Sequence, residues 1–261
     1  MQIPPAPVAI ILAHPDDPKT VAGITQRALG QGCPVALFQV TRGEGLHSAA
    51  HAGLSPIEMG AHRLEELRRF AHEIGIADLR VIGVPDGSRT LPAMREDFFP
   101  SSDLPFVDPL LDVDHVPYDD ALQPGMPFTG ESLLALLVEQ LASLQPGLVL
   151  THHPRDDHAD HRAVSYFARR ACHELAIAGG RALAPQIYGT LVYYRRCAWP
   201  PPGAWFHSEE IAVHFGRRPE QFRLRDDEYA RKLAACQAFV PTLSAAYIAS
   251  YTKRDELLWP L

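Results

Sequence analysis

The chain has 261 residues, of which 46% are apolar and 21% charged, and its 24 Lys and Arg against 31 Asp and Glu give a net charge of −7. This acidic balance argues against a general nucleic-acid-binding protein, which needs a basic surface. The longest apolar runs, over residues 8–13 and 133–138, hold six residues, whereas a membrane-spanning helix needs about 20.

The N-terminal residues and the cysteines indicate a compartment. The first seven residues have no basic region followed by an apolar one, so we expect no signal peptide. The four cysteines are at least 25 residues apart and form no C-x-x-C pair, which predicts neither a disulfide framework nor a zinc ribbon. A cytoplasmic protein is therefore expected.

Strand and helix patterns alternate along the first two thirds of the chain. Asp17-Pro18 marks one helix start, and Ser55-Pro-Ile-Glu58 is a capping box. Buried-type strands are predicted over 8–13, 34–41, 79–84 and 147–151, and helices over 17–30, 56–75, 129–145 and 161–178. Such βαβ units predict an α/β, Rossmann-like, mostly parallel sheet with helices on both faces. We expect a single domain over residues 1–261.

The last third of the chain has weaker patterns. A strand over 186–194, a further strand over 210–215 and a helix over 226–239 are predicted. No secondary structure is predicted for the tail after residue 239.

An acidic, proline-rich insertion over residues 86–130 interrupts the alternation. It holds seven prolines, nine acidic residues and two arginines. A loop of this length is either functional or disordered, so a solvated surface loop, a lid and an oligomer contact are all open. Phe98, Phe99, Phe106 and Val107 are more apolar than a solvated loop needs.

Polar segments follow each of the four N-terminal strands. They cover residues 14–17, 41–45, 85–87 and 151–161. Because ligands of open α/β sheets bind outside the carboxyl ends of the strands, these segments should converge on one crevice.

Histidines and aspartates dominate two of these segments. His14-Pro-Asp-Asp17 leaves the first strand, and four of the eleven residues of segment 151–161 are histidines, interleaved with three aspartates. Two imidazoles and a carboxylate make a three-ligand site with an open position, as in catalytic zinc centres. The alternative is that an aspartate caps the helix and His14 makes a buried hydrogen bond.

Ala13-His-Pro-Asp-Asp17 together with His158-Ala-Asp-His161 resembles the zinc-dependent de-N-acetylases of the PIG-L/LmbE-like superfamily. The likeness covers roughly residues 8–87 and 131–170. It implies removal of an acetyl group from an N-acetylated sugar or sugar conjugate of the N-acetylglucosamine type. It also implies Zn²⁺, with Fe²⁺ as another candidate metal, and a small-molecule partner. Neither nucleic acid nor membrane is expected as a partner, and homo-oligomerisation is left open.

The resemblance assigns metal and catalytic roles residue by residue. His14, Asp17 and His161 would bind the metal, and Asp16 would be the general base. His158 would stabilise the oxyanion or donate a proton.

The resemblance also implies an orienting residue and substrate contacts. Asp160 would orient His158. The substrate would contact Arg63, which would hold a sugar oxygen, together with Asp86, Arg42 and Asp156.

Two other functions use the same residues. A two-His-one-carboxylate set also occurs in non-haem iron oxygenases, although those are usually all-β proteins. A non-catalytic carbohydrate-binding homologue is the second alternative, because Lys19 and Ala159 depart from the family pattern. The chain contains no G-x-S-x-G motif and no P-loop, which argues against a serine hydrolase and an NTPase.

Overall fold

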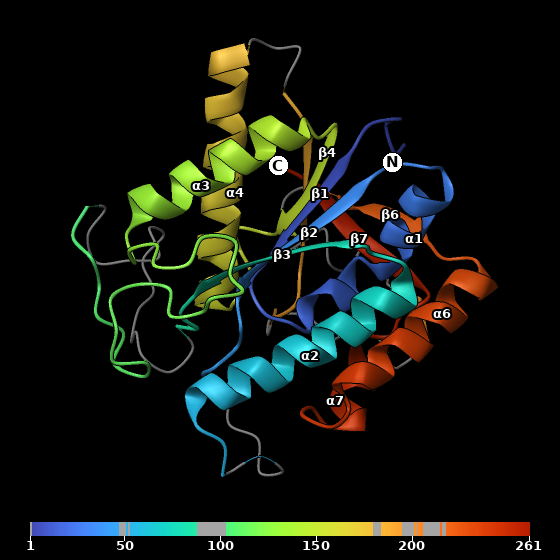
Figure 1. The fold of residues 1–261 in the computed structure, drawn as a ribbon. Helices are drawn as coiled ribbons and strands as arrows, with labels where there is room; N and C mark the ends of the chain where they lie inside the picture. The colour runs from blue at the N-terminus through green and yellow to red at the C-terminus, as the bar shows by residue number, and fades with distance from the viewer. Residues whose placement is uncertain are drawn as a thin grey trace.

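The computed structural model describes residues 2–46, 51, 53–87, 103–179, 184–194, 201, 203–205, 215 and 218–261. The first part of this chain (Figure 1) contains β1 (Val8–Leu12), η1 (Asp17–Thr20), α1 (Ala22–Gly30), β2 (Val35–Thr41), α2 (Pro56–Ile74), β3 (Asp78–Val84), α3 (Gly130–Leu144), β4 (Leu148–His152) and α4 (Ala159–Gly179). The remainder contains β5 (Gln186–Thr190), β6 (Glu220–Arg223), α6 (Asp226–Cys236), η4 (Gln237–Phe239), α7 (Ala245–Tyr251) and β7 (Asp255–Pro260).

The strands form one sheet in the order β3-β2-β1-β4-β5-β7-β6. The first five strands are parallel, with Ile10 of β1 in register with Leu37 of β2 and Leu150 of β4. Beyond β5, the strand β7 pairs antiparallel with β5, and β6 pairs antiparallel with β7. This arrangement confirms the predicted α/β fold with a mostly parallel sheet.

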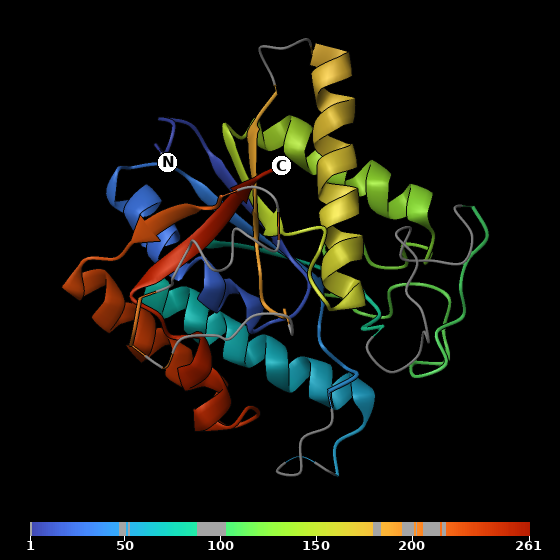
Figure 2. The ribbon, with the colours of Figure 1, turned by 180° about the vertical axis from the view of Figure 1, so that it is seen from behind.

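Helices cover both faces of the sheet (Figures 1 and 2). Alternate residues of β1, such as Val8 and Ile10, pack against α1, α2 and α6, whereas Ala9 and Ile11 pack against α3 and α4. Because every residue of β1 is buried, the strand is a continuous apolar run rather than an alternating one.

The helix predicted over 17–30 is not continuous. It is divided at Val21 into the 3-10 helix η1 and the α-helix α1. The carboxylate of Glu256, from β7, accepts hydrogen bonds from the backbone of Gly23 (2.7 Å) and Ile24 (3.0 Å). A distant side chain therefore binds the N-terminus of α1, and the side chain of Asp16, the N-cap of η1, makes no capping bond.

The C-terminal predictions need three corrections. The strand predicted over 186–194 ends at Thr190, because the backbone beyond it turns to donate to the Asp156 carboxylate. The helix predicted over 226–239 is divided into α6 and η4. The elements β6, α7 and β7 were not predicted. The strand predicted over 210–215 lies outside the described residues except for Phe215.

Part of the acidic insertion packs on the core. Val116, Tyr118, Met126 and Phe128 are buried with α3 and α4, and the backbone of Leu122 donates to Val81 of β3 at 2.6 Å. Residues 116–128 are therefore anchored on the core, so the insertion is not purely a solvated loop. Residues 88–102, which include Phe98 and Phe99, lie outside the described residues.

Across the described ranges, no helix combines the length and the apolar character needed to cross a membrane.

Candidate metal centre

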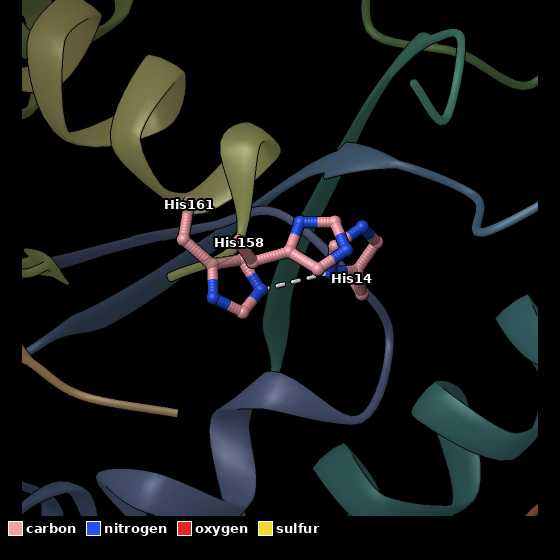
Figure 3. Close-up of side chains that lie close together, drawn as sticks. All are labelled: His14, His158 and His161. Carbon is pink, nitrogen blue, oxygen red and sulfur yellow. Dashed lines mark hydrogen bonds between the residues drawn. The ribbon is translucent and has the colours of Figure 1, made fainter. Parts of the chain in front are cut away.

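The predicted polar segments meet at the carboxyl ends of the parallel strands. His14 follows β1, Asp86 follows β3, and His158 and His161 lie at the start of α4, which follows β4. Figure 3 shows the imidazoles of His14, His158 and His161 gathered at one point, with His161 projecting from α4 towards His14. All the residues with predicted metal roles are buried.

The three predicted metal ligands form a nearly equilateral triangle of donor atoms. His14 Nδ1 lies 3.0 Å from His161 Nε2, and Asp17 Oδ2 lies 3.4 Å from each of these nitrogens. Tetrahedral ligands about 2.0–2.1 Å from zinc lie roughly 3.3–3.4 Å apart. The donor set and its spacing therefore fit a zinc-sized cation.

The charges around this triangle also fit a cation. Burial opposes protonation of His14, yet Asp86, Asp160 and Asp17 raise its pKa well above the usual value. Burial likewise opposes protonation of His161, but Asp17 and Asp156 raise its pKa to about 9. A site that favours positive charge on two adjacent imidazoles has a surplus of negative charge.

Asp156 lies behind His161. Its Oδ1 is 3.0 Å from His161 Nδ1 and accepts from the backbone of His158, and its Oδ2 accepts from the backbone of Val192 and Tyr193. Burial opposes ionisation, but His161 and these donors lower the pKa of Asp156 to about 2. Histidines that bind a metal commonly bond a carboxylate through their other ring nitrogen, which orients the ring. Asp156 occupies this position relative to His161.

Asp160 contacts two histidines through different groups. Its carboxylate Oδ2 lies 3.0 Å from His14 Nε2 but 4.0 Å from His158 Nδ1, and its backbone N–H donates to His158 Nδ1 at 3.2 Å. His158 Nδ1 is therefore an acceptor, and its ring proton is on Nε2. Burial, together with His14 and His161, lowers the pKa of His158 to about 3, so the ring is neutral.

Asp16 is held between two cations. Its Oδ2 accepts from Lys19 Nζ at 2.6 Å, and its Oδ1 is paired with Arg63. Burial raises the pKa of Asp16, but Lys19 and Arg63 lower it by more, so the net shift is downward. Gly43 has φ +72°, and a Cβ there would lie 1.8 Å from Arg63 Nη1, so only glycine admits this arginine.

Arg42 contacts the insertion. It is buried, pairs with Asp120 and lies over the ring of Tyr118 at 3.8 Å. Tyr118 in turn donates to Glu44 at 2.6 Å. Arg42 thus joins the loop after β2 to residues 103–129.

A cavity of about 610 Å³ opens beside the metal ligands. Arg63 and Asp86 line it, whereas Arg42 and Asp156 do not. The full lining is His14, Asp16, Asp17, Gly45, Leu46, Arg63, Asp86, His158, Tyr193, Thr242, Leu243, Ser244 and Tyr247.

A family model described as GlcNAc-PI de-N-acetylase, PIG-L, matches residues 9–172, more than half of the chain. The chain belongs to the PIG-L family. The predicted resemblance is confirmed, and so is the predicted class of enzyme, a metal-dependent hydrolase that removes N-acetyl groups from sugar-type substrates. No curated protein matches the chain.

Solved structures share the fold of this PIG-L protein at low sequence identity. The 4-carboxy-2-hydroxymuconate hydratase of Pseudomonas putida KT2440 is 17% identical, with a TM-score of 0.57 over 95% of this chain and 82% of that chain. The N,N'-diacetylchitobiose deacetylase of Pyrococcus horikoshii is 15% identical, with a TM-score of 0.56 over 92% of this chain and 72% of that chain. The A40926 pseudoaglycone deacetylase is 19% identical, with a TM-score of 0.57 over 98% of this chain and 97% of that chain.

The outer cavity wall lies beyond the residues matched by the PIG-L model. Tyr193 follows β5, and Thr242, Leu243, Ser244 and Tyr247 lie at and just before α7. Sequence reasoning did not find these residues, because the patterns that place α7 near the crevice are weak and β7 was not predicted.

His152 and Lys19 were also given no role. His152 is fully buried and lies 3.2 Å from Asp17 Oδ2, and its ring stacks on His161 with centroids 3.9 Å apart. Asp17, His152 and His161 form a second group of residues near enough to hold an ion. The sequence feature that could have indicated a role for His152 is its position among the four histidines of segment 151–161.

Proposed function

We propose that this protein hydrolyses the acetamide group of an N-acetylated amino sugar or its conjugate at a zinc centre held by His14, Asp17 and His161. The observation that carries the proposal is the triangle of donor atoms, with sides of 3.0, 3.4 and 3.4 Å, at the wall of a cavity of about 610 Å³. A cavity of this size suits a mono- or disaccharide.

When bound, Zn²⁺ lowers the pKa of a coordinated water to about 7 and so makes a nucleophile available at neutral pH. The Asp16 carboxylate lines the same cavity next to the ligand Asp17, and it accepts the proton of the attacking water. The water oxygen bonds to the carbonyl carbon, the C–N bond breaks, and the proton passes from Asp16 to the leaving amine. The products are acetate and a free amino sugar.

His158 supports the carbonyl oxygen as it gains negative charge. Its Nδ1 accepts from the backbone N–H of Asp160, so the ring proton is on Nε2, and this Nε2–H is the group that donates to the carbonyl oxygen. Because the ring is neutral, it acts as a hydrogen-bond donor and not as the acid. A single donor of this kind contributes roughly 10²–10³ in rate in other hydrolases.

The substrate rests against the outer wall of the cavity. Tyr193 and Tyr247 offer aromatic surface for a sugar ring, and Arg63 and Asp86 are the charged side chains placed to bind hydroxyl groups. Arg42 and Asp156 are left out of the substrate contacts in this proposal, because neither lines the cavity.

Metal analysis and amine release test the proposal together. The purified protein should contain about one zinc per chain and release amine from at least one of N-acetylglucosamine, N,N'-diacetylchitobiose and an N-acetylglucosaminide of a polyol. Chelation should abolish release, and added Zn²⁺ should restore it. The deacetylated sugars are the matched controls.

Other results would support the alternatives. Bound iron with oxygen consumption would indicate an oxygenase. Sugar binding without amine release at full metal content would indicate a binding homologue. The cytoplasmic location remains a prediction, and homo-oligomerisation is left open. Cys33, Cys172 and Cys236 are buried and form no disulfide, as a reducing compartment favours.

A further inference from the structure

Lys19 is a fully buried lysine in η1, at the side of the metal centre. Burying an ammonium group is costly unless it is paired and hydrogen-bonded. The partners of this group therefore show what the fold holds it for.

The ammonium group of Lys19 donates two hydrogen bonds to Asp16. Its Nζ donates to Asp16 Oδ2 at 2.6 Å and to the Asp16 backbone carbonyl at 2.9 Å. The same nitrogen lies 4.6 Å from the ring centre of Tyr251 and 5.5 Å from that of Tyr247, both in α7. The two aromatic rings therefore also stabilise the ammonium.

The other oxygen of Asp16 is fixed from a different element. It pairs with Arg63 of α2, and Arg63 Nη1 also donates to the carbonyl of Gly43 at 3.2 Å. The Asp16 carboxylate is therefore held at both oxygens, by cations from η1 and α2. Rotation of this carboxylate would break at least one ion pair.

We infer that Lys19 is a positioning residue, which holds the Asp16 carboxylate in the orientation needed to accept the proton of the attacking water. The inference rests on the proposed function, because it assumes that Asp16 is the base. Lys19 itself does not line the cavity and acts only through its contact with the Asp16 carboxylate. Its effect should therefore appear in the chemical step and not in substrate binding.

The test compares Lys19→Met and Lys19→Arg with Lys232→Met. Lys232 is a matched control, because it is equally buried and pairs with Glu256 at 2.8 Å, outside the cavity lining. In Lys19→Met, kcat should fall roughly 10²-fold with KM within about threefold of the parent and zinc content unchanged, since misplacement by ~1 Å can cost that much. In Lys19→Arg, kcat should be at least tenfold higher than in Lys19→Met. Lys232→Met should lose thermal stability but keep kcat within about threefold of the parent.

Three results would overturn the inference: parent kcat in Lys19→Met, equal loss of kcat in Lys19→Met and Lys232→Met, or loss of zinc from Lys19→Met. If Lys19→Met does not fold, Lys19→Gln takes its place with the same readouts.

A crystal structure of the Lys19 variant separates this inference from the proposed function. The Asp16 carboxylate should turn away from its parent orientation, because only the ion pair with Arg63 then holds it. An unmoved carboxylate would overturn the inference even if no substrate is found. Absence of amine release by the parent protein would instead contradict the proposed function.

Discussion

The inner and outer walls of the cavity are built from different parts of the chain and by different means. The inner wall carries His14 and Asp17, which follow a strand of the parallel sheet, with His161 of α4 directly behind them. The outer wall carries Tyr193 and Tyr247, which come from the chain after β5 and from α7. The residues matched by the family model include the inner wall and end before the outer one.

This difference separates chemistry from recognition. The inner wall is held by a hydrogen-bonded network in which every ligand has a buried partner, such as Asp156 behind His161 and Asp160 behind His14. In the outer wall the backbone of Tyr193 donates to Asp156, but the contact between Tyr193 and Tyr247 is between side-chain hydroxyls. Changes at the inner wall should therefore abolish function, and changes at the outer wall should adjust it.

The largest effect is expected from removal of a metal ligand. His14→Ala or His161→Ala leaves two of three donors, so at least 90% of the bound metal should be lost, as measured by elemental analysis after dialysis. His173→Ala, an exposed histidine on α4, is the control and should keep its metal. Full metal retention in both ligand variants would contradict the assignment of this triangle.

The next effect divides the two adjacent aspartates of the inner wall. Asp16→Asn should keep the metal and lower kcat roughly 10²–10⁴-fold, because it removes the proton acceptor. Asp17→Asn should lose metal first, since Asp17 Oδ2 is a corner of the donor triangle. Metal titration and single-turnover amine release measure the two effects separately. Equal metal loss in both variants would show that the two roles are not distinct.

A smaller effect is expected at the outer wall. Tyr247→Ala removes ring surface from the cavity and should lower kcat/KM about tenfold, mainly through KM, with the metal retained. Tyr247→Phe, which loses only the hydroxyl contact, should lower kcat/KM about threefold. Tyr166→Phe on the outside of α4 is the control. A loss of kcat as large as that of Asp16→Asn would mean that the two walls do not act separately.

The same division explains what could be predicted from the sequence. Buried parallel strands are continuous apolar runs, and polar residues directly after them must meet at one edge, so the site at the ends of β1 to β4 followed from the pattern. The motif resemblance, and not the spacing, supplied the roles of Asp16 and Asp17.

The remaining features depend on contacts between distant residues. The strand β7 begins with Asp255 and Glu256, and two charged residues are not typical of a buried strand, so the sequence pattern does not predict it. Glu256 is buried there because it caps α1 and pairs with Lys232. The carboxylate of Asp160 faces His14, and its backbone faces His158, which no spacing could show. In the sequence Lys19 is only a departure from the family pattern, because its pairing with Asp16 depends on the folded structure.

The smallest effect concerns the contact that supports the inner wall from the insertion. Glu44 is buried beside Tyr118, and burial raises its pKa from 4.5 to about 7, although the Tyr118 hydrogen bond opposes the shift. A carboxyl group with a raised folded-state pKa contributes stability below pH 4.5, and this contribution is lost as the pH rises through 7.

Glu44→Gln should therefore stabilise the protein at pH 8 relative to the parent, by about 1–3 kcal/mol, and much less at pH 5. For a chain of this size that corresponds to a rise in Tm of several degrees, roughly 2–4 °C per kcal/mol. Glu73→Gln, an exposed residue of α2, is the control and should follow the parent at both pH values. A difference in Tm between Glu44→Gln and the parent that is the same at pH 5 and pH 8 would show that Glu44 does not titrate in this range. Kinetic constants at pH 7 should stay within about twofold, because Glu44 supports the wall without lining the cavity.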